Sequence, residues 1–127
     1  SETMTFATAG HPPPLILDRG GHVRALNTAN SPLIGLNETL FAGTYRLADT
    51  APFPCGSQLV LYTDGLVERR DRSFATGVEQ MATGLSDIPT HLRPVELIDA
   101  LLAALIGTRT PTDDIAILVV EQLSRST

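Results

Sequence analysis

The chain has 127 residues, of which 43% are hydrophobic and 18% are charged, so it can form one domain with a core and is not extensively disordered. The formal net charge of −5 argues against a nucleic-acid-binding surface. All nine basic residues are Arg, a bias that indicates no particular function. The single Cys55 excludes an internal disulfide and is typical of a reducing cytoplasm. No apolar stretch approaches the roughly 20 residues of a membrane span.

The first half of the chain is predicted to be mainly β-structure. Strands are expected at 4–8, 15–17, 23–26 and 44–47. The second and third of these flank the turn sequence at 19–22, which contains two glycines and predicts a β-hairpin. Residues 27–39 are rich in Asn, Ser and Gly and are expected to form a loop. Pro52 and Pro54 are expected to end the strand at 44–47.

The second half is predicted to contain two helices between two strands. The strands are expected at 58–63 and 115–120, and the helices at 79–85 and 94–106. The second helix has leucines and isoleucines spaced by three and four residues, which places them on one face. Pro94 suits the first turn of this helix and Gly107 suits its end. We expect its apolar face to pack on the sheet.

Acidic residues stand at one end of each of the two late strands. Asp64 follows the first strand, whereas Asp113 and Asp114 precede the second. If these strands are antiparallel neighbours, about 4.8 Å apart, the carboxylates fall at the same edge of the sheet and can share a cation. Hard oxygen ligands of this kind suit Mg²⁺ or Mn²⁺. Taken singly, each motif also fits an ordinary strand end and turn.

The same segments resemble those of a known family. Residues 62–68, Tyr-Thr-Asp-Gly-Leu-Val-Glu, are similar to a signature of bacterial PPM-type serine/threonine phosphatases of the SpoIIE/RsbU branch. Residues 113–116, Asp-Asp-Ile-Ala, resemble the last motif of that branch. Residues 9–15, Ala-Gly-His-Pro-Pro-Pro-Leu, resemble a third motif, and residues 32–36, Pro-Leu-Ile-Gly-Leu, more weakly resemble a fourth. The four segments occur in the family's order and cover nearly the whole chain.

The chain also departs from the family's pattern. No segment matches the two earlier acidic motifs, one of which reads Asp-x-x-Gly-His-Gly, and Ser57 stands where the family often has Asp. The resemblance therefore implies that residues 1–127 are a single partial phosphatase domain, the C-terminal half to two-thirds, without the N-terminal metal motifs. It implies an α+β fold, a mostly antiparallel β-sheet sandwich with helices packed on the sheet face.

The resemblance implies metal-dependent hydrolysis of phosphoserine or phosphothreonine in a regulatory protein, such as an antagonist in sigma-factor control. Two Mn²⁺ or Mg²⁺ ions are expected in the complete domain, with Asp64 and Asp113 as the main ligands and Asp114 as a weaker one. The isolated chain is expected to be inactive and to self-associate through its exposed sheet. Alternatives are a non-catalytic phosphatase-like binding module and a scaffold or metal-binding β-protein unrelated to phosphatases.

Other polar residues have more ordinary interpretations. His11 lies in a tight Gly-Pro context, where a structural hydrogen bond competes with a catalytic role. Glu68 could orient a water near a metal or pair with one of the arginines at 69, 70 and 72. That Arg cluster could meet a phosphate, but a solvated face is the favoured interpretation. No residue is assigned as catalytic from the sequence.

Overall fold

The computed structural model describes residues 2–27, 30–31, 48–68, 73–89, 92–107 and 114–123. In chain order the strands are β1 (Thr3–Phe6), β2 (Thr8–Ala9), β3 (Leu15–Leu17), β4 (Val23–Ala25), β5 (Asn30–Ser31), β6 (Asp49–Pro52), β7 (Gln58–Tyr62) and β8 (Ile117–Glu121). Between β7 and β8 come the helices α1 (Asp64–Val67), α2 (Phe74–Asp87) and α3 (Pro94–Leu105). None of the described helices is long and apolar enough to cross a membrane.

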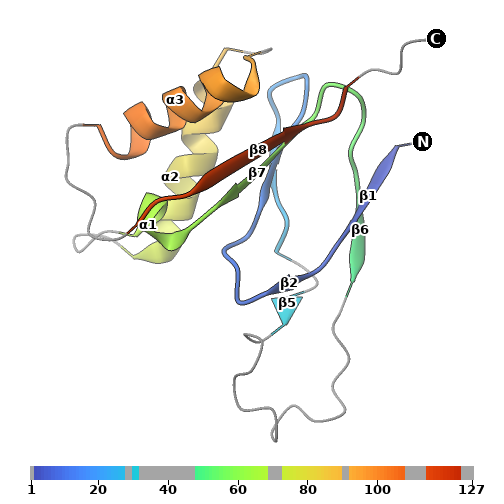
Figure 1. The fold of residues 1–127 in the computed structure, drawn as a ribbon, viewed down its shortest axis with the longest axis horizontal. Helices are drawn as coiled ribbons and strands as arrows, with labels where there is room; N and C mark the ends of the chain where they lie inside the picture. The colour runs from blue at the N-terminus through green and yellow to red at the C-terminus, as the bar shows by residue number, and fades with distance from the viewer. Residues whose placement is uncertain are drawn as a thin grey trace, which may run out of the picture.

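The central element is a four-stranded antiparallel sheet in the order β4-β3-β7-β8 (Figure 1). β7 and β8 pair over their full length, from Gln58 opposite Glu121 to Tyr62 opposite Ile117. The prediction that the two late strands are antiparallel neighbours is therefore confirmed. The predicted α+β class, with antiparallel strands and helices packed on a sheet, is also confirmed.

The β3–β4 connection is the hairpin that the sequence predicted. The Asp18 carboxylate accepts hydrogen bonds from the backbone N–H groups of Gly20, at 2.8 Å, and His22, at 2.9 Å. Gly21 has a φ of 87°, a conformation that glycine adopts without strain. The hydrogen bond from the His22 backbone contributes most to lowering the pKa of Asp18. The turn is thus held by the aspartate that precedes it.

The helices begin and end at residues suited to those positions. α2 begins after Ser73, whose hydroxyl accepts a hydrogen bond from the Thr76 N–H at 3.2 Å. α3 begins at Pro94, and Gly107 follows it with a φ of 59°. The predicted helix at 79–85 is too short, because α2 extends five residues earlier and two later. The prediction for α3 is confirmed to within one residue.

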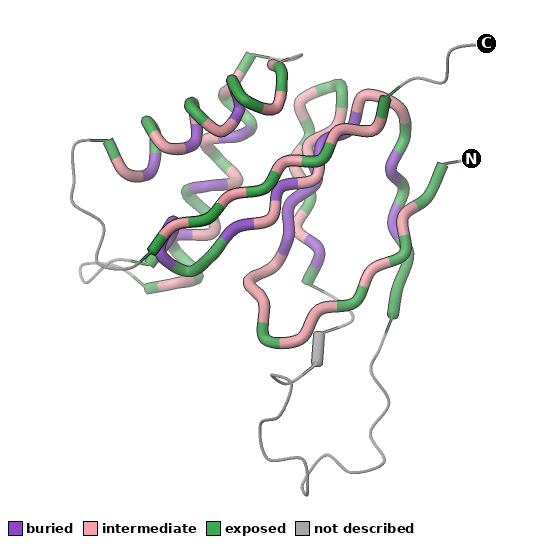
Figure 2. The backbone as a smooth tube through the Cα atoms, in the orientation of Figure 1, coloured by how far each residue is buried: buried purple, intermediate pink, exposed green. Residues whose placement is uncertain are grey.

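The main core lies between the helices and one face of the four-stranded sheet. Along β7 burial alternates, so that Val60 and Tyr62 are buried while Leu59 and Leu61 are less so (Figure 2). The buried members of this cluster are Leu15, Val60, Tyr62, Leu66, Val67, Met81, Leu85, Leu97, Leu101 and Leu105. All three helices contribute, and α1–α3 lie together on this face of the sheet (Figure 1).

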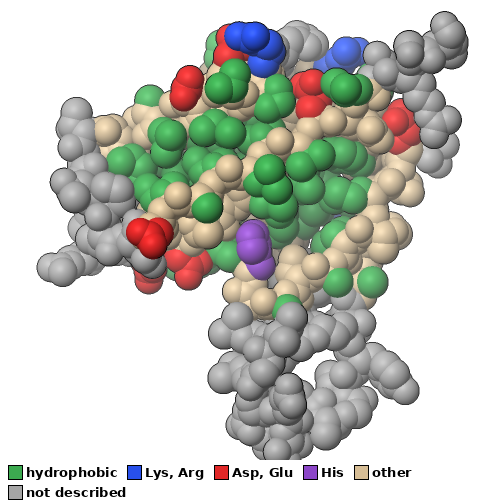
Figure 3. Space-filling model, viewed as in Figure 1, with side chains coloured by type: hydrophobic (Ala, Val, Ile, Leu, Met, Phe, Trp, Pro, Cys, Tyr) green, Lys and Arg blue, Asp and Glu red, His purple; other side chains and the backbone are tan. Residues whose placement is uncertain are grey.

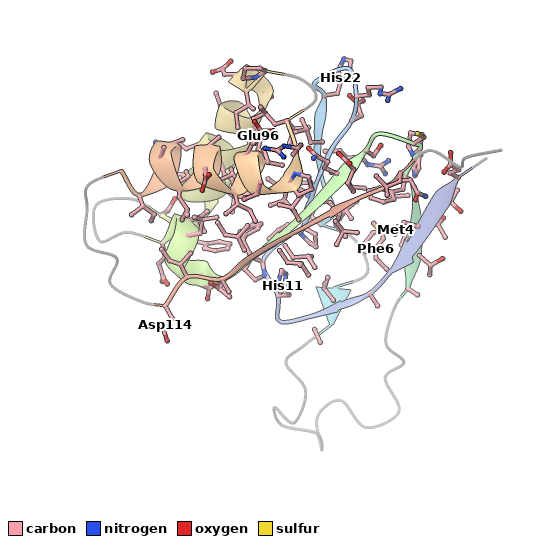
Figure 4. The ribbon with its side chains drawn as sticks, turned by 45° about the horizontal axis from the view of Figure 1, so that its top comes forward. Met4, Phe6, His11, His22, Glu96 and Asp114 are labelled. Carbon is pink, nitrogen blue, oxygen red and sulfur yellow. The ribbon has the colours of Figure 1, made fainter. Side chains whose placement is uncertain are left out.

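A second, smaller cluster involves the opposite face of the sheet. Its buried residues are Ile16, Leu26, Ala51 and Phe53, with Met4, Phe6 and Leu59 packed against them (Figure 4). β8 presents Leu118 and Val120 outward, with 56% and 43% of their surface exposed. Figure 3 shows hydrophobic side chains gathered over this part of the molecule. One sheet face is therefore helix-covered, and the other is only partly covered.

The N-terminal strands differ from the prediction. The expected strand at 4–8 is divided at Ala7, because β1 pairs antiparallel with β6 whereas β2 pairs parallel with β5. β5 also lies within the segment predicted as a loop. β6 ends at Pro52, where a missing N–H is tolerated because β6 pairs only with β1 among the described strands. The predicted strand at 44–47 lies outside the described residues.

Candidate functional site

Asp64 stands where β7 gives way to α1. β7 ends at Tyr62, and Asp64 is the first residue of the short helix, with its side chain exposed. The turn forms because the Leu66 N–H donates to the Thr63 carbonyl at 3.0 Å and the Glu68 N–H donates to the Asp64 carbonyl at 2.8 Å. Leu66 and Val67 are fully buried in the main core, so packing fixes the helix that carries this carboxylate.

Asp114 lies at the same edge of the sheet, on the segment that leads into β8 (Figure 4). The β7–β8 register places Tyr62 opposite Ile117. One step further along, the Thr63 N–H donates to the Ala116 carbonyl at 3.1 Å. The fold therefore brings the first acidic motif and the start of the second together, as the antiparallel arrangement required. Asp113 lies outside the described residues.

Thr63 joins the two acidic segments through its side chain. Its hydroxyl oxygen accepts a hydrogen bond from the Ala116 N–H at 2.9 Å and donates to the Asp114 carbonyl at 3.3 Å. Sequence reasoning did not single out this residue. The available signal was a hydroxyl side chain between the end of a buried strand and an aspartate.

Tyr62 connects the site to the segment at 9–15. Its buried hydroxyl donates to the Pro13 carbonyl at 2.8 Å, and the His11 ring meets the Tyr62 ring edge-on, with centroids 6.3 Å apart. Burial, followed by the negative charge of Asp64, raises the pKa of Tyr62 to about 12. Tyr62 therefore stays protonated and keeps its hydrogen bond at physiological pH. Three of the sequence motifs meet around β7.

The carboxylate oxygens at this edge are of a type that suits a divalent metal ion, but they are few. Asp64 and Asp114 supply carboxylate oxygens, which are the ligands that Mg²⁺ and Mn²⁺ prefer. Across the described ranges, however, no three His, Cys, Asp or Glu side chains are grouped closely enough to hold a metal ion. A metal centre here thus requires further ligands besides these two carboxylates.

The remaining polar residues named from the sequence have three different placements, since Glu68 lies near this edge, His22 lies far from it, and others are not described. Glu68 follows α1 directly and is exposed. His22 lies in the β3–β4 turn, near the start of β7 and hence at the other end of the sheet (Figure 4). The Arg cluster at 69–72 and the segment at 32–36 lie outside the described residues.

Solved structures with a similar fold include RsbU and RsbW domains and the phosphatase domain of SpoIIE. The RsbU and RsbW domains of Rv1364c from Mycobacterium tuberculosis match 100% of this chain, with a TM-score of 0.81 and 25% identity. The PP2C phosphatase domain of SpoIIE from Bacillus subtilis, with a fragment of its regulatory domain, matches 94%, with a TM-score of 0.73 and 24% identity. A manganese-presoaked SpoIIE phosphatase domain from the same organism matches 98% of this chain, with a TM-score of 0.69 and 20% identity.

These likenesses define the fold as that of a PP2C-type phosphatase domain. The family model of Stage II sporulation protein E (SpoIIE) matches residues 1–122, and the chain therefore belongs to the SpoIIE family. The resemblance inferred from the motifs is confirmed. The chain spans 35%, 34% and 52% of the three solved chains, respectively.

Proposed function

We propose that this chain is part of a metal-dependent serine/threonine protein phosphatase and carries one side of its metal centre. The observation that supports this most directly is the Thr63–Ala116 connection, which brings Asp64 and the Asp114 segment to one edge of the sheet. Membership of the SpoIIE family supports the reaction class. Two described carboxylates are too few to hold an ion by themselves, so the proposal requires further ligands, Asp113 among them.

In this proposal Asp64 and Asp113 bind the metal, and Asp114 contributes more weakly. When bound, two Mn²⁺ or Mg²⁺ ions would activate a water and hold the phosphoryl oxygens. Asp64 supplies its charge from a helix fixed by buried Leu66 and Val67. Tyr62 holds the segment at 9–15 against the same end of β7.

The proposed substrate is a phosphoserine or phosphothreonine in a regulatory protein, with an antagonist protein of sigma-factor control as the preferred class. Its location is proposed to be the cytoplasm, in keeping with the single Cys55. The second candidate function is a phosphatase-like module that binds a phosphoprotein without hydrolysing it.

Mutation of the carboxylates in a phosphatase domain that contains this segment tests the proposal. Asp64→Asn keeps the side-chain shape but removes the charge, so Mn²⁺-dependent hydrolysis of a phosphopeptide should fall at least about a hundredfold. Asp113→Asn should be nearly as damaging and Asp114→Asn less so. Asp99→Asn, an exposed carboxylate on α3, is the matched control and should retain full activity.

Two results separate the candidates. Full activity of Asp64→Asn would show that the ligand assignment is wrong. Tight binding of a phosphoprotein by the unmutated domain, with no Mn²⁺-dependent release of phosphate, would favour the binding module.

A further inference from the structure

The hydrogen bonds of Thr63 depart from a regular β-ladder. Its N–H donates to the Ala116 carbonyl at 3.1 Å, as an antiparallel partner would. The return bond differs, because the Ala116 N–H donates at 2.9 Å to the Thr63 side-chain oxygen. The Thr63 carbonyl instead accepts from the Leu66 N–H at 3.0 Å, which forms the first turn of α1. The hydroxyl thus takes the place that the carbonyl would fill in a continued ladder.

Because the hydroxyl replaces the carbonyl as the acceptor, Thr63 can bond both to the segment before β8 and to the first turn of α1. If the Thr63 carbonyl remained in the ladder, it could not close the turn that begins at Asp64. If the carbonyl left without a replacement, the Ala116 N–H would lose its acceptor at the point where β8 begins. The hydroxyl also donates to the Asp114 carbonyl at 3.3 Å, so it holds the backbone on both sides of Ile115.

The hydroxyl of Thr63 is not used to cap the helix. Although Thr63 occupies the N-cap position of α1, its side chain makes no capping hydrogen bond. Both side-chain hydrogen bonds of Thr63 go instead to a segment more than 50 residues away in the sequence. The side chain therefore acts between the two acidic segments and not within the first one.

We propose that Thr63 is the positioning residue that fixes the backbone at 114–116, and with it Asp114, relative to Asp64. The expected effect on metal binding rests on the proposed function. The positioning of the backbone rests only on the hydrogen bonds of Thr63. A ligand pair held through backbone atoms keeps its spacing without any contact to the carboxylates themselves. Loss of the hydroxyl should leave both aspartates present but less well placed.

The test compares Thr63→Val, which keeps the β-branched shape and removes the hydroxyl, with Thr63→Ser, which keeps the hydroxyl. In the 127-residue chain, amide hydrogen exchange at Ala116 should accelerate about tenfold in Thr63→Val and stay near the wild-type rate in Thr63→Ser. Exchange at Leu59 and Val120, which the alternation of the ladder makes a hydrogen-bonded pair further along β7 and β8, should not change. Thr5→Val, an exposed strand threonine in β1, is the matched control.

A second measurement addresses the metal. In a phosphatase domain that contains this segment, Thr63→Val should weaken Mn²⁺ binding about tenfold as measured by calorimetry, and Thr63→Ser should restore it. Unchanged Ala116 exchange in Thr63→Val, or equal losses in both variants, would overturn the positioning role whether or not metal binds. Failure of the unmutated domain to bind Mn²⁺ would overturn the proposed function, while the exchange experiment still decides the role of Thr63.

Discussion

Gly77 of α2 lies directly against the backbone carbonyl of Val67, the last residue of α1. A Cβ added at Gly77 would stand 2.3 Å from the Val67 oxygen, which is much closer than non-bonded atoms approach. Because the obstacle is backbone and not a flexible side chain, relief requires α1 and α2 to move apart. The position of the helix that carries Asp64 therefore depends on a glycine in the next helix.

Gly77→Ala should lower the free energy of unfolding by about 3 kcal/mol, because the added methyl overpacks the α1–α2 contact. Gly84→Ala, in the same helix, is the matched control, since its Cβ would meet nothing within 4 Å. That control should raise the free energy of unfolding by up to about 1 kcal/mol through helix propensity. Urea unfolding of both variants measures the contrast, and equal effects would contradict it.

The buried Tyr62 hydroxyl should make stability depend on pH in the alkaline range. Its folded pKa is raised to about 12 from an ordinary 10, so the folded state holds the proton more tightly than the unfolded state. The resulting stabilisation is fully present below pH 10 and is lost as the pH rises towards 12. It amounts to about 3 kcal/mol, since each pKa unit corresponds to about 1.4 kcal/mol.

Tyr62→Phe should remove this alkaline dependence and cost about 1 kcal/mol at neutral pH, since the Pro13 carbonyl loses its donor. Urea unfolding at several pH values compares the two proteins. A wild-type curve that stays flat between pH 10 and 12 would show that the Tyr62 hydroxyl is not held in this way.

The hydroxyl of Ser57 is buried without a hydrogen-bond partner among the described residues. The residue as a whole is also fully buried. Ser57→Ala should therefore raise the free energy of unfolding by about 1 kcal/mol. Ser86→Ala, an exposed helix position with a hydroxyl bonded to the Ala82 carbonyl, should change it by less than about 0.5 kcal/mol. Thermal unfolding distinguishes the two.

The partly covered sheet face is predicted to cause self-association of the 127-residue chain. β8 has one neighbour among the described strands, and Leu118 and Val120 are exposed on it. Light scattering should show a dimer or larger species, which Leu118→Glu should shift towards monomer. Val95→Glu, which replaces an equally exposed apolar residue on α3, should leave the distribution unchanged. A wild-type chain that stays monomeric at high concentration would contradict the prediction.

The sequence predicted the elements whose signals are local. The apolar runs at β7 and β8, the leucine stripe of α3 and the glycine turn after Asp18 each depend on residues close together in the chain. α2 was predicted too short, although Ser73 supplies a cap and Phe74, Val78, Met81 and Leu85 follow a helical spacing. Weak helix formers such as Gly77 and Thr76 obscured that pattern, and packing against α1 and α3 overrides them.

Other features could not be predicted because their cause is distant in the sequence. Nothing near Ala7 shows that the chain changes partners there, from β6 to β5. Likewise, the role of the Thr63 hydroxyl depends on the Ala116 N–H, 53 residues later. The positions of the carboxylates, after one strand and before the other, did predict that Asp64 and the Asp114 segment share a sheet edge if the strands are antiparallel neighbours. The metal-binding role of Asp64, Asp113 and Asp114 stays a prediction.

The pairing of β7 with β8 also has a kinetic consequence. The side chains of Gln58 and Glu121 are hydrogen-bonded across a sequence separation of 63 residues, and all three helices lie within that span. The β3–β4 hairpin, in contrast, closes over a short turn. Because loop closure must precede the long-range contacts, the hairpin and helices can form early, whereas β8 joins the sheet late. During synthesis β8 emerges after all three helices, so β7 must await its partner while the helices fold.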